Sequence, residues 1–400
     1  MKRLALPLVL LLPALGLAQK ENYAVKNGPK DATNVVVVVP NDKFPYDISV
    51  NGVNSMAQAS DFTKASVVII PKLKPGETAT IGRYVRKDGD PAPGQPQVFT
   101  VEEKPGEYVD FQFGKPLLRY VNKPRDEQNH YLTFKPFHQV FDPATGKTLL
   151  SSGAHPNVPE FKFPHHRGLF FGFNNISYGD KQTADIWHGT KNVYSTHDKM
   201  VLTETGPIYG RHVAAISWHG QDGKAFAEEE RDVTVYNTGG GTMIDWKTTL
   251  STKLPKVRLD GDPQHAGFHF RATQEVSKTT AKETYYLRPD GKGKEGETRN
   301  WDKEKKDPKT VNLPWNAMSF VTDGTRFTAL RINHPDNPGD TRGSERDYGR
   351  FGDYFEYDLT PEKPLKLKYR VWVQKGTMTL EQCEAMAAGF VQKVEVKGKK

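Results

Sequence analysis

Two adjacent histidines followed by an arginine form the stretch of this sequence most able to do chemistry. His165, His166 and Arg167 stand at the start of an apolar, aromatic run at residues 169–173. Imidazoles transfer protons or bind metal ions, and a guanidinium binds carboxylates or hydroxyl groups. The stretch therefore predicts one wall of a site, with His165 and His166 as candidate catalytic residues and Arg167 as a candidate substrate-binding residue.

The aromatic run predicts a buried strand that the two histidines enter through a tight turn. Neighbouring strand residues point to opposite faces, so His165 and His166 share a site only if the backbone bends between them. Without a bend, we expect His166 to face the site and His165 to be structural. Trp187 and His188 follow, and an indole beside polar groups suits stacking on a sugar, so both are candidate substrate-binding residues. The alternative is a pair of histidines that bond loop carbonyls.

A second polar cluster lies in the segment 262–271. On an extended chain His265, His269 and Arg271 share one face with Gly267, which leaves room for a ligand or for another backbone. We take His265 as a candidate catalytic residue, and His269 and Arg271 as candidate substrate-binding residues. A row of polar side chains on a solvated sheet face is the alternative.

A third cluster is the acidic stretch 228–232. Glu229 and Arg231 share one face of the expected strand, and such a pair keeps its carboxylate ionised. This state suits ligand binding by Arg231 and general-base catalysis by Glu229. A charged strand rim is the alternative.

The fourth cluster combines residues 333–338 with residues 347–352. His334 is a candidate catalytic residue, and Asn337 and Tyr348 are candidate substrate-binding residues. The turn chemistry of the first segment is dense, so Asn337 also has a purely structural interpretation.

The same histidines are also candidate metal ligands. Residues 165, 166, 265, 269 and 334 could assemble a metal site, but no HExxH, paired CxxC or EF-hand spacing is present. The sequence also lacks a GxSxG elbow, a phosphate loop and a dinucleotide fingerprint. No cofactor is predicted, and a bound divalent metal remains possible.

The elements that must position these residues are mostly strands. Short β-branched and aromatic segments separated by Gly and Pro turns recur along the chain and predict an all-β protein. Only the end is expected to be helical, because Thr379 and Gln382 form a capping box before apolar residues at helical spacing. Cys383 lies on that apolar stripe and is expected to be a buried core thiol.

The chain divides into three expected segments. Residues 1–18 have the charged start, short apolar region and small-residue cleavage site of a signal peptide, so we expect a secreted or periplasmic protein. Residues 19–114 predict a small, immunoglobulin-like β-sandwich as an accessory domain. Longer strands over residues 115–400 predict a large β domain that carries the site.

The composition argues against nucleic acids as partners and against a membrane span. The 56 basic and 48 acidic residues are dispersed, which does not fit a nucleic-acid-binding surface. No segment has the length of apolar sequence that a membrane span needs. With one cysteine the fold must be held by its core, and the oligomeric state stays open.

Taken together, the clusters resemble a bacterial family of unknown function whose members often carry the label "PmoA-like" or "methane oxygenase". The resemblance covers roughly residues 116–391. The methane label conflicts with the sequence, because membrane methane oxygenase subunits need several apolar spans. Family members often read Glu-Thr-Arg where this chain has Glu-Glu-Arg at 229–231. The resemblance rests on residues 165–172, Trp187, Glu229 and Arg231, residues 265–267, residues 333–338 and residues 347–349.

The expected fold is similar to the galactose-mutarotase-like supersandwich, which sugar epimerases, polysaccharide lyases and several glycosidases share. This resemblance implies a carbohydrate substrate and, as the leading hypothesis, a glycoside hydrolase or lyase with general acid/base chemistry. The alternatives are a non-catalytic glycan-binding protein and a metal-dependent hydrolase that uses the histidine set.

Overall fold

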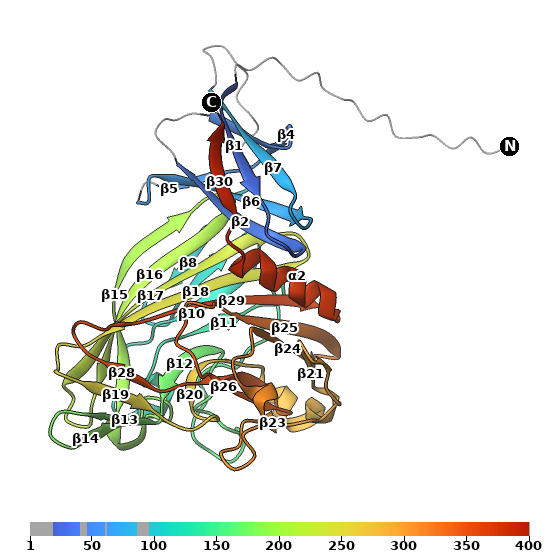
Figure 1. The fold of residues 1–400 in the computed structure, drawn as a ribbon. Helices are drawn as coiled ribbons and strands as arrows, with labels where there is room; N and C mark the ends of the chain where they lie inside the picture. Colours follow the sequence, from blue (N-terminus) through green and yellow to red (C-terminus); the bar gives the residue numbers. More distant parts are fainter. Residues whose placement is uncertain (1–18, 41–45, 61, 86–95, 400) are drawn as a thin grey trace.

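The structure is a computed structural model that describes residues 19–40, 46–60, 62–85 and 96–399 (Figure 1). Its main body is two nine-stranded antiparallel sheets packed face to face. The sheet that carries the predicted site is called the front sheet. In spatial order it consists of β23 (Arg299–Asn300), β26 (Arg342–Arg346), β27 (Arg350–Tyr354), β20 (Ala266–Arg271), β12 (Leu169–Phe173), β11 (Phe137–Val140), β10 (Pro116–Val121), β9 (Tyr108–Gln112) and β8 (Thr100–Lys104).

The opposite sheet, called the back sheet, contains the longest strands. A four-stranded sheet of β14 (Gln182–Ala184), β13 (Asn175–Tyr178), β19 (Val257–Asp260) and β28 (Tyr357–Leu359) completes the main body. In spatial order the back sheet consists of β15 (Tyr194–Thr205), β16 (Tyr209–His219), β17 (Ala225–Thr238), β18 (Gly241–Ser251), β29 (Leu365–Lys375), β25 (Thr325–Asn333), β24 (Trp315–Thr322), β21 (Tyr285–Arg288) and β22 (Gly291–Lys292).

Strand β12 shows how the front sheet separates two environments. Every residue of β12 is buried, so both faces of this strand are covered. Phe171 packs against Trp218 and Trp246 of the back sheet, inside the sandwich. Phe170 points to the other face, where it meets Trp187. The predicted buried strand is confirmed, and its alternation creates an outer face on which a site can be built.

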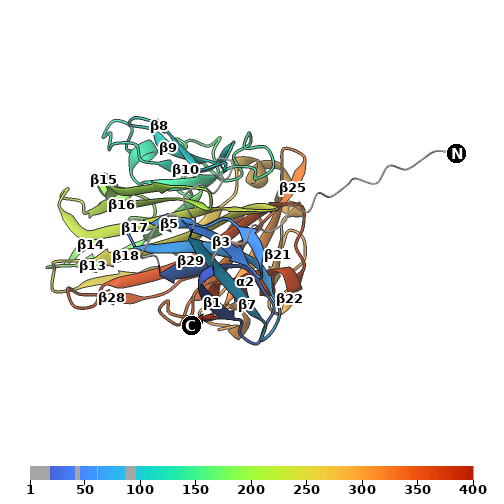
Figure 2. The ribbon, with the colours of Figure 1, turned by 90° about the horizontal axis from the view of Figure 1, so that it is seen from above.

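A second, smaller sandwich lies at one end of the molecule (Figures 1 and 2). It has its own apolar core, formed mainly by valine and isoleucine side chains. One sheet is β30 (Glu395–Lys399), β1 (Gln19–Lys26), β7 (Thr78–Val85), β3 (Tyr46–Val50) and β4 (Val53–Ser55), and the other is β2 (Ala32–Pro40), β6 (Ala65–Leu73) and β5 (Gln58–Ser60).

The domain boundary that the sequence predicted at residue 114 does not coincide with the division between the two sandwiches. Strands β8 and β9 pair with β10 in the front sheet, and β30 returns from the end of the chain to pair with β1. Local turn signals cannot reveal such pairing, because strands of similar composition fit either sheet. The small sandwich therefore combines strands from both ends of the chain.

The C-terminal helix α2 (Leu380–Val391) joins the two bodies. Thr379 and Gln382 form the predicted capping box, and Cys383 is buried, so both predictions are confirmed. Cys383 and Met386 pack against the outer face of the back sheet, while Ala388 belongs to the core of the small sandwich. A single turn, α1 (His130–Thr133), is the other α-helix in the described part of the chain. The prediction of an all-β protein with one C-terminal helix is confirmed.

The expected signal peptide at residues 1–18 lies outside the described residues. Among the described residues, no helix has the length and apolar character that crossing a membrane requires.

Candidate functional site

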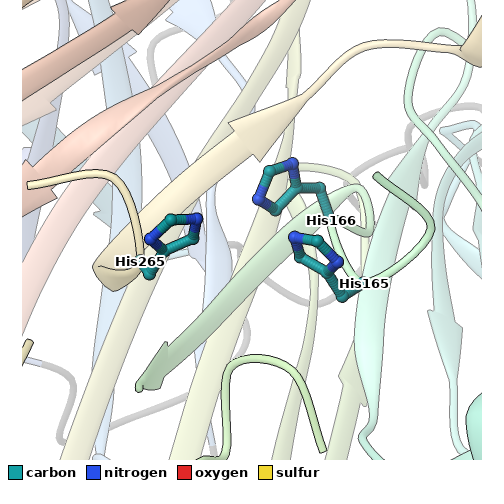
Figure 3. Close-up of side chains that lie close together, drawn as sticks. All are labelled: His165, His166 and His265. Atoms are coloured by element: carbon teal, nitrogen blue, oxygen red, sulfur yellow. The ribbon is translucent and has the colours of Figure 1, made fainter. Parts of the chain in front are cut away.

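The backbone bends sharply where the paired histidines enter β12. Phe163 adopts a left-handed conformation with a φ of 52°, and the amide of His166 donates to the carbonyl of Phe163 over 3.0 Å. This turn replaces the extended backbone that would have sent the two rings to opposite faces. Both His165 and His166 therefore face one place on the outer side of the front sheet, together with His265 (Figure 3).

Four histidines converge there, and we call them the histidine cluster: His165, His166, His188 and His265. Each of His165, His166 and His265 offers a ring nitrogen within 4.8 Å of those of the other two. The ring of His188 lies 4.5 Å from that of His165 and 4.8 Å from that of His265. The predicted meeting of residues 165 and 265, one hundred positions apart, arises because β12 pairs with β20.

Two members of the cluster are held by carboxylates. Nδ1 of His265 lies 2.9 Å from Asp262, and Nδ1 of His188 lies 2.9 Å from Asp185. A carboxylate at Nδ1 selects the tautomer with its proton there and leaves Nε2 with a free lone pair. Desolvation raises the pKa of Asp262, but the hydrogen bond and charge of His265 outweigh it and lower this pKa to about 2. Both imidazoles thus have a ring that a carboxylate orients.

His166 is the buried member of the cluster. Its side chain is 1% exposed, and neither ring nitrogen has a hydrogen-bond partner. Burial, and then the neighbouring His165 and Arg350, lower the pKa of His166 well below its usual value. Burial and the adjacent His188 likewise lower the pKa of His165. Both rings are therefore neutral at physiological pH and can accept or donate a hydrogen bond or bind a metal ion.

Four buried basic side chains lie near the cluster: Lys135, Arg167, Arg271 and Arg350. Burial lowers the pKa of Arg167 to about 9 and that of Arg271 to about 10. Lys135 donates to the carbonyl of Trp187, and burial lowers its pKa well below the usual value. Arg350 donates to the hydroxyl of Tyr348 over 3.1 Å. Buried basic side chains thus lie beside the cluster together with the two carboxylates that hold His188 and His265.

An aromatic pair borders the cluster. Phe163, 40% exposed, stacks on Tyr348 with ring centroids 4.3 Å apart. Tyr348 in turn lies nearly parallel to His166, with centroids 6.1 Å apart. Such a partly exposed, flat surface beside hydrogen-bonding groups suits the apolar face of a sugar ring.

Trp187, His269 and Arg167 form the floor of the site. Trp187 is fully buried and meets His166 edge to face, so it is not the exposed stacking surface that the sequence predicted. Both ring nitrogens of His269 are used, by the carbonyl of Ala266 and by Arg350, which indicates a structural role. Arg167 donates to the carbonyls of Tyr131 and Lys135 and is also fully buried.

Gly267 allows β20 and β27 to approach each other. Its φ is 90°, and a Cβ there would lie 1.8 Å from the carbonyl oxygen of Asp353. Of the two predicted reasons for this glycine, a ligand or another backbone, the structure shows the second.

Glu229 and Arg231 lie on β17 and face the interior of the sandwich instead of the cluster. Two nitrogens of Arg231 donate to Glu229, over 2.7 and 3.0 Å. Trp218 and Thr248 donate to the same carboxylate, so each of its oxygens accepts two hydrogen bonds. Because the front sheet stands between this pair and the cluster, the catalytic and binding roles expected of Glu229 and Arg231 are replaced by a structural one.

Replacing Glu229 with glutamine is expected to lower the free energy of unfolding by about 2–3 kcal/mol, because the buried charge of Arg231 loses its partner. Urea denaturation measures this change. The matched control is Glu230→Gln on the exposed face of the same strand, with an expected change within about 0.5 kcal/mol. Equal midpoints for the two variants would contradict the structural role.

His334 and Asn337 are also remote from the cluster, since they border the outer face of the back sheet. His334 packs against Phe390 of α2 and lines a cavity of about 410 Å³ beside the small sandwich. Asn337 accepts from the amide of Lys368 over 2.7 Å and donates to its carbonyl over 2.8 Å. The structural alternative for Asn337 is the one observed, and His334 does not join the catalytic set.

The model of a family of unknown function, DUF6807, matches residues 109–388. The chain belongs to this family. The matched region covers the front sheet from β9 onward, the back sheet and the complete histidine cluster. The family description carries no methane oxygenase label, so that part of the resemblance finds no support.

Three solved structures are similar to this DUF6807 protein. They are a glycosyl hydrolase family 38 protein and an alpha-mannosidase, both from Enterococcus faecalis, and a galactose mutarotase related enzyme from Lactobacillus acidophilus. The identities are 10%, 10% and 9%, and the TM-scores are 0.44, 0.47 and 0.32. The alignments cover 94%, 94% and 70% of this chain and 47%, 46% and 98% of the others.

The chain thus spans about half the length of the first two structures. Similarity at this level assigns no activity. No curated protein is similar enough to count as a match.

A divalent metal fits part of the cluster. Nitrogens that bind one zinc ion at about 2.0–2.1 Å lie about 3.4 Å apart, compared with an upper limit of 4.8 Å among His165, His166 and His265. Asp262 supplies the carboxylate that commonly supports a metal-bound imidazole. The surrounding cations oppose a further positive charge. The possible divalent metal therefore stays a prediction.

Sequence reasoning missed several residues of the site. Both carboxylate–histidine pairs have the spacing Asp-x-x-His, at Asp185–His188 and Asp262–His265. This repeated spacing is visible in the sequence and could have pointed to both pairs. Phe163 and Lys135 carried no comparable signal. Their roles depend on a left-handed turn and on burial, which the sequence pattern does not reveal.

Proposed function

We propose that this DUF6807 protein is an enzyme that acts on a carbohydrate at the histidine cluster. The observation that carries the proposal is the convergence of His188 and His265, each held by a carboxylate, beside the partly exposed Phe163–Tyr348 pair. The aromatic pair supplies a stacking surface, and the oriented imidazoles supply groups that transfer protons.

The two carboxylate-bound histidines are the proposed acid/base pair. Their side chains are 25% and 28% exposed, so a substrate reaches them from solvent. A ring nitrogen that is free while the other is fixed by a carboxylate is arranged to take up and return a proton. His165 and His166, kept neutral by burial, would orient the substrate through hydrogen bonds.

A panel of neutral and acidic oligosaccharides tests the proposal. The expected result is release of reducing ends, which indicates hydrolysis, or an absorbance from an unsaturated uronide, which indicates β-elimination. Loss of the product in a His188→Ala, His265→Ala double variant with an unchanged circular dichroism spectrum places the reaction at the cluster. Tight glycan binding without turnover over days would overturn the enzyme and leave a glycan-binding protein.

Metal-dependent hydrolysis is a second candidate, favoured by the meeting of His165, His166 and His265. It requires stoichiometric metal in the purified protein and loss of turnover with a chelator. Turnover that is unaffected by chelator, in protein without bound metal by elemental analysis, would remove this candidate and leave proton transfer by His188 and His265.

A further inference from the structure

Buried arginines in this protein are commonly neutralised by a carboxylate. Four of them form ion pairs in which the arginine and its acidic partner are both buried. Such pairing is expected, because a buried charge without a partner is strongly destabilising. The four pairs are Arg231–Glu229, Arg288–Glu345, Arg331–Asp353 and Arg370–Asp245.

The cations around the histidine cluster break this pattern. Arg167, Arg271, Arg350 and Lys135 are all buried, and within the described residues none of them forms an ion pair with a carboxylate. Their hydrogen bonds go to carbonyls, hydroxyls and His269. Asp185 is close enough to act on the charge of Lys135, but His188 already holds it. Three buried guanidinium groups, those of Arg167, Arg271 and Arg350, therefore lie here with no carboxylate bonded to them, while Asp185 and Asp262 are already engaged by His188 and His265.

Of the four, Arg271 has the most hydrogen-bond donors without a partner. It is fully buried, and its Nε and Nη2 have no hydrogen-bond partner, while Nη1 donates to the carbonyl of Tyr348. Its guanidinium carbon lies 5.0 Å from the centre of the Tyr348 ring. The free edge of a guanidinium is the donor geometry that binds a carboxylate or a sulfate with two parallel hydrogen bonds.

We propose that the missing countercharge is supplied by the ligand, so that this site binds an anionic group of an acidic glycan, with Arg271 as its main contact. This inference rests on the proposed function for the carbohydrate part of the ligand. The anionic group is a carboxylate, as in a uronate, or a sulfate ester. Arg271 lies next to the Tyr348 ring, so an anionic group on a glycan that stacks on the Phe163–Tyr348 pair lies close to this guanidinium.

Calorimetric titration of the full chain compares ligands that differ only in charge. The probes are an oligogalacturonate, its methyl ester, a sulfated galactan fragment with its desulfated form, and inorganic phosphate. We expect at least one acidic glycan to bind tenfold or more tightly than its uncharged form. A preference for the oligogalacturonate identifies the anionic group as a carboxylate, and a preference for the sulfated galactan fragment identifies it as a sulfate ester. Equal affinity within both matched pairs would overturn the proposal, and so would binding of phosphate alone.

Two arginine variants locate the anion. In Arg271→Met the preference for the acidic glycan is expected to disappear, and in Arg271→Lys to fall at least threefold. Without ligand, Arg271→Met should melt at the same temperature as the parent or higher, because it removes an unpartnered buried charge. The control Arg331→Met breaks the pair with Asp353 and should melt lower. A preference that survives in Arg271→Met overturns the assignment, and a marked fall in its melting temperature shows that Arg271 is an ordinary structural residue.

These outcomes separate the inference from the proposed function. Turnover of a neutral glycan, with no preference for acidic ones, would overturn the anion site and leave the enzyme. Binding of an acidic glycan that Arg271→Met abolishes, with no turnover of any glycan, would support the anion site and overturn the enzyme.

Discussion

Acidification from pH 7.5 to 5.5 is expected to lower the free energy of unfolding by at least about 5 kcal/mol. Four fully buried histidines carry most of this effect, His138, His166, His212 and His269, and His165, whose pKa burial also lowers, adds to it. Burial lowers the pKa of each of the four, to about 3 for His212 and well below the usual value for the other three. The native protein therefore keeps them neutral across this range.

The sign of the effect follows from where protons bind. In the unfolded chain each histidine titrates near pH 6.5, so it takes up a proton as the pH falls while its native counterpart does not. The unfolded state then binds more protons, and stability decreases with decreasing pH. Each histidine contributes about 1.4 kcal/mol between pH 7.5 and 5.5, and the four together about 5 kcal/mol.

Urea denaturation at a series of pH values measures the slope, which reports the number of protons taken up on unfolding. His212→Gln, which removes one partner of the 2.9 Å contact with His138, is expected to reduce the uptake by about one proton. His219→Gln, at a partly exposed position on the end of β16, is the matched control. A free energy of unfolding that is constant between pH 7.5 and 5.5 would contradict the buried neutral state.

The elements of this fold that depend on local patterns could be predicted from the sequence. The aromatic run at β12 and the capped helix α2 are both specified within a dozen residues. A strand pattern also shows which residues share a face, and Glu229 and Arg231 do share one. It does not show whether that face points into the sandwich or out of it. For this reason Glu229 was expected in the site but lies in the interior.

Long-range pairing decides the composition of the site. His265 reaches His165 because β20 lies beside β12, and His334 is excluded because β25 belongs to the other sheet. Two-sheet architecture separates residues that look equivalent along the chain. The cluster could be anticipated as a group of histidines, but its four members are selected by the pairing of β12 with β20, the turn at Phe163 and the bond between Asp185 and His188.

Replacing His265 with alanine is expected to lower kcat/KM for the glycan substrate by about 10²–10⁴-fold, which is the usual contribution of a general acid or base. The ring of His265 is fixed by Asp262 and lies beside the other three histidines of the cluster. Because the side chain is partly exposed, the variant should keep the parent's stability to within about 1 kcal/mol. Steady-state kinetics and urea denaturation of the same preparation give both quantities, with His219→Ala as the matched control.

The role of Asp262 follows from the same geometry and sharpens the test. Asp262→Asn keeps a group of the same size but does not hold the proton on Nδ1 of His265, so kcat should fall while KM changes little. Added imidazole should partly restore turnover in His265→Ala if the residue transfers a proton. Loss of a stoichiometric metal in that variant, without rescue by imidazole, would assign His265 to metal binding instead. Unchanged kcat/KM in both variants would remove His265 and Asp262 from the reaction.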